Sequence, residues 1–418
     1  MRKMAIEPEI NIRTPENVEP AKLTSVFGNI GFLFLWVGQL TSQMADRVFI
    51  YVLMIIAYKL TRTNLGVAVP LLSFGIPSLL FGSVAGVFVD KLDRKGIMIV
   101  SDLLRGALIL LIVPLVGKSM FLIFAVSFLI YTIAQFFAPA ETASIPELVK
   151  KKNLIIANSL FMVTWIGSSM VGFGLGAPLV AFLGEEATFV AAAALYAASA
   201  GAIFMIPLKS REVKNPKKDK GFVSDFMQGL EFIRRNFVVN YSLIKMFVAT
   251  SAIAVISLLA ISYAKEVLGI GAKNFGYLII CVGIGMMAGM PVLNRLSRRF
   301  KKGTIVIFGF ILSGLTLIGL AYTTDLRHAL MLTFSLGLCN VFVTSSIQTI
   351  LQQKIPRSIR GRVFGVQNML INSAFIVPVL IWGCIADSWG TQFALALIGA
   401  IVLCVGLASI FVPKFKYA

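Results

Sequence analysis

The amino-acid sequence predicts an all-α membrane protein whose twelve transmembrane helices form two pseudo-symmetric six-helix halves. The chain of 418 residues is 58% hydrophobic and only 14% charged, whereas soluble proteins carry about 45–50% apolar and about 25% charged residues. Uncharged runs such as 304–322 and 394–412 approach the roughly 20 residues that a spanning helix needs. Lipid offers no partners to backbone amides, so the spans are expected to be helices.

Apolar runs between charge blocks and turn signals define the expected spans in chain order. They are residues 31–59, 65–89, 96–116, 120–143, 154–183, 188–207, 240–264, 275–294, 304–322, 328–352, 363–385 and 391–412.

The longest connection separates six spans from six, which gives an N-terminal half at 1–207, a linker at 208–239 and a C-terminal half at 240–418. The linker is basic at first and then amphipathic. Its apolar side chains Phe222, Phe226, Leu230 and Ile233 recur at helical spacing. This pattern predicts a helix lying in the membrane interface.

The basic residues set the expected orientation. A net charge of +19 is distributed in blocks between apolar runs, which is typical of topology signals and not of a nucleic-acid surface. One set of alternate connections, with both chain ends, holds most of the 38 basic residues, whereas the other set holds few. The positive-inside rule therefore predicts a multi-pass protein of the cell inner membrane with both termini in the cytoplasm.

No cofactor or metal is expected from the sequence. The four cysteines fall in separate apolar stretches, and the single histidine, His328, lies near the end of a span beside Arg327. Neither pattern is typical of a disulfide framework or a metal motif. A membrane enzyme is disfavoured because no nucleophile–base pair or carboxylate dyad is evident. A non-transporting sensor or channel is also disfavoured, because the linker contains no recognisable regulatory domain.

Two segments six spans apart resemble each other. Residues 85–95 end the second expected span with Gly, Asp and basic residues, and residues 288–299 end the eighth with Gly, Asn and basic residues. Parallel half-domains leave such internal repeats in transporter sequences.

These residues carry a resemblance to the major facilitator superfamily. Gly86, Asp90, Lys91, Arg94 and Lys95 match its pattern between spans two and three, with Asp93 in place of the usual mid-loop Gly. Stretches 36–47, 101–105, 139–158 and 355–363 resemble the macrolide-efflux and enterobactin-exporter branch. Lysophospholipid transporters share several of these stretches. The antiporter-like glycine signature expected in span five is interrupted, because Ala177 precedes Pro178.

The resemblance implies a cytoplasmic gate that engages the C-terminal half when that side is closed. The expected gate residues are Gly86, Asp90, Lys91, Arg94, Lys95, Asp102 and Arg105. Asp102 and Arg105 are three apart on one helix and close enough to pair. The alternative is an ordinary basic rim.

Polar residues within the spans are candidates for a substrate cavity or proton coupling, because charge in the bilayer is costly and needs a reason. Gln39, Ser42, Gln43 and Asp46 share a helical face that is expected at the gap between the halves. Arg47 points about 100° away and could pair with an acid on another span, and Glu141 is the other deep acid. Other polar residues recur four apart and so share a helical face. They are expected either to line a cavity or to form interhelical hydrogen bonds, and the sets are Tyr131 and Gln135, then Asn340, Thr344 and Gln348, then Asn368 and Asn372.

The leading hypothesis is a monomeric secondary transporter that exports an amphipathic small molecule of drug, macrolide or siderophore type. Alternating access with proton antiport is the expected mechanism. The expected partners are thus the substrate, protons and the lipid bilayer, with no nucleic acid. The alternatives are a lysophospholipid flippase and a nutrient importer of the same fold.

Overall fold

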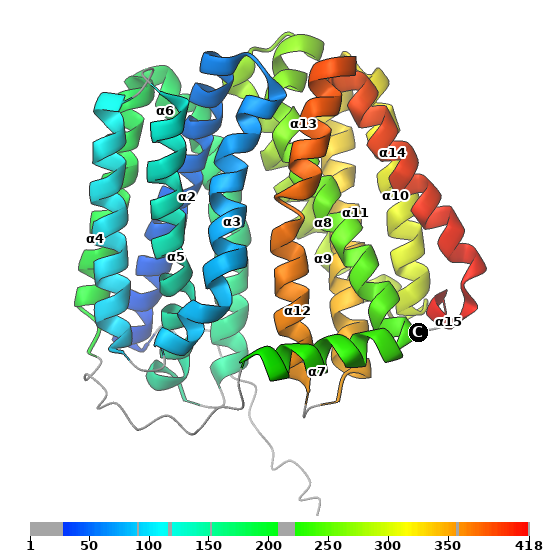
Figure 1. The fold of residues 1–418 in the computed structure, drawn as a ribbon, viewed down its shortest axis with the longest axis horizontal. Helices are drawn as coiled ribbons and strands as arrows, with labels where there is room; N and C mark the ends of the chain where they lie inside the picture. The colour runs from blue at the N-terminus through cyan, green and yellow to red at the C-terminus, as the bar shows by residue number, and fades with distance from the viewer. Residues whose placement is uncertain are drawn as a thin grey trace, which may run out of the picture.

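The computed structural model describes residues 28–89, 92–115, 119–150, 153–207, 222–356 and 359–416, and within these ranges every regular element is helical. Two bundles stand side by side in Figure 1. The first contains α2 (Ile30–Thr61), α3 (Asn64–Val89), α4 (Arg94–Ile112), α5 (Met120–Leu148) and α6 (Leu154–Phe204). The second contains α7 (Phe222–Arg235), α8 (Phe237–Ser262), α9 (Gly276–Leu296), α10 (Lys302–Tyr322), α11 (Leu326–Lys354), α12 (Arg360–Ser373), α13 (Val377–Trp389), α14 (Thr391–Ala408) and α15 (Pro413–Lys416).

In the described residues, 10 helices are long and apolar enough to cross a membrane. That number counts α6 once, although its backbone turns at Gly184 (φ 82, ψ 174) and joins two helices. It also leaves out α4, whose apolar character is diluted by Arg94, Lys95, Asp102 and Arg105. The twelve crossings predicted from the sequence are reached only if the two arms of α6 are counted separately and α4 is added, so the number twelve stays a prediction.

The eleventh expected span, 363–385, is two helices in the structure. α12 ends at Ser373 and α13 begins at Val377. Pro378 occupies the first turn of α13. Proline has no backbone N–H to donate to a preceding turn, so it starts a helix more readily than it continues one.

The two ends of the bundles differ in charge. α7 lies across one end of the second bundle, the end at which the chain's C-terminus is also found (Figure 1). At this same end α4 begins at Arg94, α11 ends at Lys354, and Arg299 follows α9. We call it the basic end. Arg362 of α12 donates a hydrogen bond to Gln228 of α7 (2.7 Å). α7 occupies the part of the linker where an interfacial helix was expected, and its place in a membrane interface stays a prediction.

Glycines let the helices of the second bundle approach closely. A Cβ at Gly337 of α11 would lie 1.9 Å from the carbonyl oxygen of Val282 on α9, and a Cβ at Gly285 would lie 1.9 Å from that of Phe334. In lipid the hydrophobic effect does not drive helices together, and the close packing that small residues permit contributes to helix association instead.

Gly337→Ala is therefore expected to lower the thermal stability of the purified protein. The added methyl group must push α9 and α11 apart, and overpacking of this kind typically costs about 1–3 kcal/mol. Gly365→Ala is the matched control, because a Cβ at this helical glycine of α12 meets nothing within 4 Å. Equal melting temperatures for the two variants would contradict the close α9–α11 crossing.

Candidate functional site

A buried ion network joins three helices inside the N-terminal half. Arg105 of α4 is 1% exposed and forms an ion pair with Asp102, which is fully buried. The same guanidinium donates from Nη1 to both carboxylate oxygens of Asp46 on α2, at 3.3 and 3.4 Å. We call the set Ser42, Asp46, Asp102, Arg105, Tyr196 and Ser199 the buried ion network.

Hydroxyl groups complete the network. Ser42 donates to Asp102 Oδ1 (3.1 Å) and accepts from Arg105 Nη2 (3.0 Å). Ser199 of α6 donates to Asp102 Oδ2 (2.5 Å), and the hydroxyl of Tyr196 donates to Asp46. Each oxygen of Asp102 thus has a donor, as a buried carboxylate requires.

Local sequence explains why these side chains meet. Asp93 caps the start of α4 by accepting from the Gly96 N–H (3.0 Å), which fixes where the helix begins. Asp102 and Arg105, three residues apart, then share one face, and their predicted pairing is present. The rings of Phe137 and Tyr196 lie on the guanidinium, with centroids 4.9 and 4.5 Å from its central carbon. Such cation–π contacts further stabilise a desolvated cation.

The network contains two carboxylates and one guanidinium. Asp46 and Asp102 share the single cation of Arg105, and the side chain of Asp46 is 27% exposed whereas those of the other two are essentially buried. Asp46 is consequently the network carboxylate that water or protons reach most directly.

Glu141 of α5 is 7% exposed, and its Oε1 atom is buried with no hydrogen-bond partner. It interacts electrostatically with Asp102, Arg105 and Asp46. Ionisable groups placed this deeply in spans are characteristic of ion and proton pathways.

The polar face of α2 packs inside the N-terminal half instead of lining the gap between the halves. Gln39 is 3% exposed and donates to the Phe161 carbonyl on α6 (3.3 Å). Gln43 accepts from Ser168 of α6 (2.9 Å). The shared face expected from the sequence exists, but its neighbours are α4 and α6.

Arg47 has no carboxylate within ion-pairing distance among the described residues. Its guanidinium carbon lies 5.6 Å from the ring centroid of Trp165 on α6. Its Nε atom is buried without an acceptor. The expected pairing of Arg47 with an acid on another span is therefore replaced by an aromatic contact.

The other predicted residue pair of the N-terminal half lies on α5. Tyr131 is 4% exposed and packs edge-on to Phe74 of α3, with ring centroids 5.5 Å apart. Gln135 donates to the Tyr131 carbonyl (3.1 Å) and lies next to Gly82 of α3. Both residues thus join α5 to its neighbour in the same half.

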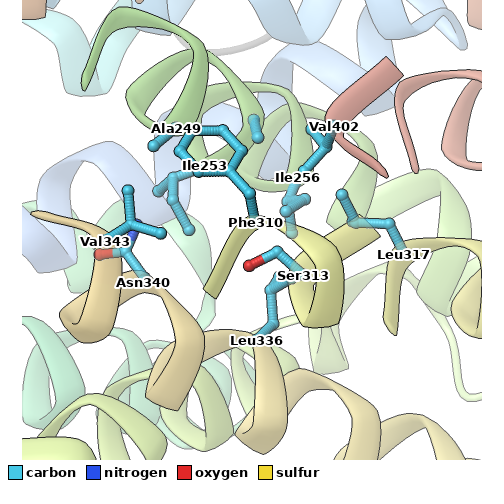
Figure 2. Close-up of a pocket in the computed structure, with 11 residues that line it drawn as sticks. Ala249, Ile253, Ile256, Phe310, Ser313, Leu317, Leu336, Asn340, Val343 and Val402 are labelled. Atoms are coloured by element: carbon cyan, nitrogen blue, oxygen red, sulfur yellow. The ribbon is translucent and has the colours of Figure 1, made fainter. Parts of the chain in front are cut away.

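The predicted residues of the C-terminal half divide between two places. Asn340 lies beside a small pocket enclosed by α8, α10, α11 and α14, with Ser313 across from it (Figure 2). Thr344 donates back to the Asn340 carbonyl (2.8 Å). Gln348 accepts from Gln367 of α12 (2.7 Å), whereas Asn368 is exposed and Asn372 half-buried on α12.

The predicted gate residues that the structure describes are not brought together as one cluster. Arg94 donates to Glu147 (2.7 Å) and to the Ala143 carbonyl (2.8 Å), and Lys95 donates to the Ile206 carbonyl (2.8 Å). Asp102 and Arg105 belong to the buried ion network. Gly86 is in α3, and Asp90 and Lys91 lie outside the described residues. A gate function for this set stays a prediction.

Hydrogen bonds between the two halves gather at the end opposite the basic end. Asp387 of α13 accepts from the backbone N–H of Asn64 (2.6 Å) and of Leu65 (2.9 Å), so a carboxylate of one half caps helix α3 of the other. Such capping is favourable because helix N-termini carry free N–H groups and partial positive charge. Ser262 also donates to the side chain of Asn64.

A second group of contacts strengthens the same closure. Tyr58 of α2 donates to Glu266 (2.8 Å), and the ring of Tyr51 stacks on Phe275 with centroids 4.5 Å apart. We call Tyr58, Asn64, Ser262, Glu266 and Asp387 the latch. The halves are thereby closed against each other at the end away from α7.

Sequence reasoning missed several of these residues. Tyr196 and Ser199 are polar groups three apart in an alanine-rich stretch, a spacing that signals a shared face. Glu266 and Asp387 are acids in connections that carry few charges. Their partners come from distant helices, which sequence spacing does not reveal.

Two helical bundles that close against each other at one end agree with the architecture of secondary transporters built from two half-domains. The sequence profile of the Major Facilitator Superfamily matches residues 35–378. The chain belongs to this family, and it is a multi-pass membrane transporter.

Relatives and solved structures agree with that assignment. The chain is 22% identical to the uncharacterized MFS-type transporter YfiS of Bacillus subtilis, over 92% of this chain and 93% of that protein. It is 23% identical to macrolide efflux protein A of Streptococcus pyogenes (90% and 94%). It is 24% identical to multidrug efflux pump Tap of Mycolicibacterium fortuitum (82% and 85%). The crystal structure of nucleoside transporter NupG superposes with a TM-score of 0.76 at 12% identity, covering 93% of this chain and 100% of that one.

Proposed function

We propose that this transporter exports an amphipathic small molecule by alternating access, in exchange for protons that enter through the buried ion network. The observation that carries the proposal is the sharing of one guanidinium, Arg105, by two carboxylates, Asp46 and Asp102. This arrangement leaves an excess negative charge inside the bundle. A proton on Asp46 neutralises that charge and releases Arg105 from one of its partners.

Alternating access needs two closures that are used in turn. The latch supplies the closure at the end of the molecule opposite the basic end. The distribution of Lys and Arg favours a cytoplasmic location for the basic end, so that both chain termini are cytoplasmic and the latch faces outward.

Export, rather than uptake, is supported by the relatives that are efflux proteins. A macrolide efflux protein and a multidrug efflux pump align over most of the chain, and so does a putative bacilysin exporter of Bacillus subtilis, at 25% identity. The substrates named for these proteins differ in chemistry. We therefore propose a drug, macrolide or siderophore-like substrate, moved by a monomer; lysophospholipid flipping and nutrient uptake remain alternative activities of the same fold.

Asp46→Asn is expected to abolish proton-driven accumulation of erythromycin in inside-out vesicles, since the amide cannot take up and release a proton. Exchange of labelled for unlabelled erythromycin without a gradient is expected to persist, because that exchange needs only the conformational change. Both rates are measured in the same vesicle preparation. Gradient-driven accumulation at the wild-type rate in Asp46→Asn would remove Asp46 from the coupling step.

Glu231→Gln is the matched control. Glu231 is an exposed acid on α7 that pairs with Arg235, so its replacement removes a carboxylate outside the membrane. We expect this variant to accumulate erythromycin like the wild type. An equal loss in both variants would point to expression or folding as the cause.

A further inference from the structure

Arg47 is a cation in the middle of α2 that has no counter-ion among the described residues. No described carboxylate lies within ion-pairing distance of it, and its buried Nε has no acceptor. Charged side chains inside membrane spans almost always pair with one another or with backbone carbonyls, and they commonly mark substrate or ion pathways.

The nearest acid in sequence does not neutralise Arg47. Asp46 is bonded by Arg105 at 3.3 Å and by the Tyr196 hydroxyl, on the side of α2 that faces α4 and the second arm of α6. Asp102 is likewise bound to Arg105. The positive charge of Arg47 is thus compensated by no group of the buried ion network.

The surroundings of Arg47 include a partly exposed aromatic side chain and a close contact with a glycine. Trp165 lies under the guanidinium at 5.6 Å, yet 51% of this tryptophan is exposed, so part of its ring is available to another molecule. Gly172 of α6 makes the approach of Arg47 possible, because a Cβ there would lie 2.4 Å from the Arg47 Cβ.

This place adjoins the seam between the halves. α6 meets α9 of the other half through Met170, which lies against Gly283, and through Gly174, which lies against Ile280. Ser169, half-buried on α6, lies one turn from Trp165 on the same side of the helix. A cation, an indole face and a hydroxyl therefore occur together beside the surface where the halves separate during alternating access.

We propose that Arg47 and Trp165 form the binding site for an anionic group on the substrate, whose apolar or aromatic body packs on the indole. This inference rests on the proposed transport function and adds amphipathic anions to its substrate class. A carboxylate, catecholate or phosphate can accept two hydrogen bonds from a guanidinium fork. An anionic lipid headgroup and a free organic anion offer the same chemistry.

The test compares two xanthene dyes with similar ring systems and opposite charge, fluorescein as the anion and a rhodamine ester as the cation. Binding to the purified wild-type protein in lipid nanodiscs is measured by fluorescence anisotropy. We expect fluorescein to bind more tightly. Arg47→Gln should weaken fluorescein binding roughly tenfold or more, as expected for loss of a charge-assisted hydrogen bond, and should leave the rhodamine ester unaffected.

Two further variants separate charge from structure. Arg47→Lys keeps the charge and should retain part of the affinity for fluorescein, and Trp165→Leu should weaken both dyes. Arg62→Gln removes an exposed cation at the latch end of α2. This variant should change the binding of neither dye. If lysophosphatidylglycerol displaces fluorescein, the anion site binds a lipid headgroup. If only soluble organic anions displace fluorescein, the same site binds a free organic anion.

Several results would overturn the inference. They are tighter binding of the rhodamine ester by the wild type, unchanged fluorescein binding in Arg47→Gln, and binding of neither dye. If erythromycin is nevertheless accumulated against its gradient, the proposed export function stands and only the anion site is lost. If no proton-driven transport of erythromycin or either dye occurs, the proposed function itself fails.

Discussion

Replacing Arg105 by Gln is expected to cause the largest loss of stability of any single substitution considered for this protein. The change leaves Asp102, which is fully buried, without a cation. Removing one partner of a buried ion pair typically costs about 3–5 kcal/mol, because an uncompensated charge remains behind. Thermal unfolding of the detergent-solubilised protein measures the effect, and we also expect transport to be lost.

A double variant distinguishes this cause from a general disturbance of α4. Arg105→Gln combined with Asp102→Asn removes both charges, so the double variant should be more stable than Arg105→Gln alone. Arg94→Gln on the same helix is the control, because Arg94 and its partner Glu147 are partly exposed and such pairs contribute about 1 kcal/mol or less. The absence of any rescue in the double variant would contradict the network as described.

Asp387→Ala is expected to open the end of the molecule that the latch closes. The substitution removes the acceptor for two backbone N–H groups at the start of α3. Hydrogen bonds to charged groups contribute about 1.5–3 kcal/mol, and each 1.4 kcal/mol shifts an equilibrium about tenfold. Accessibility from the latch side should therefore rise about tenfold or more.

The measurement uses a chain in which the four native cysteines are replaced and Ser169→Cys provides the only thiol. A membrane-impermeant maleimide added from the latch side should label Ser169→Cys slowly, and faster when Asp387→Ala is also present. Asp325→Ala is a matched control, because Asp325 caps α11 within the C-terminal half by accepting from the His328 N–H. Equal labelling rates with and without Asp387→Ala would show that the latch does not hold the halves together.

The sequence predicts the spans well because burial in lipid imposes a simple rule on them. An uncharged run long enough to cross the bilayer must be a helix. The turn between the fifth and sixth expected spans appears in the structure as the positive-φ residue Gly184. The break before Val377 was not predicted, because the apolar run continues through it and only Pro378 signals a new helix.

The candidate site was less predictable, because spacing shows which residues share a face and not what that face meets. The stripe with Gln39 and Gln43 was expected at the gap between the halves and instead bonds α6. Asp102 and Arg105 were expected at a cytoplasmic gate, and the structure shows Arg105 paired both with Asp102 and with Asp46, a residue of the predicted cavity. Which helix meets which face is decided by packing between segments far apart in the chain.

The buried ion network changes how the predicted residues relate to one another. Asp46, from the expected proton-coupling set, and Arg105, from the expected gate set, are direct partners. A proton that binds Asp46 alters the charge balance on α2, α4 and α6 together. If Asp46 takes up protons as proposed, the shared cation links that uptake to the contacts among these three helices.

Proton flux coupled to substrate movement tests the central claim most directly. Purified protein is reconstituted into liposomes that contain a pH-sensitive dye, erythromycin is loaded inside, and the external solution is rapidly diluted. The account predicts that outward movement of erythromycin drives protons inward, so that the lumen acidifies, and that Asp46→Asn abolishes the acidification. Erythromycin efflux with no change in luminal pH in the wild-type protein would contradict proton antiport.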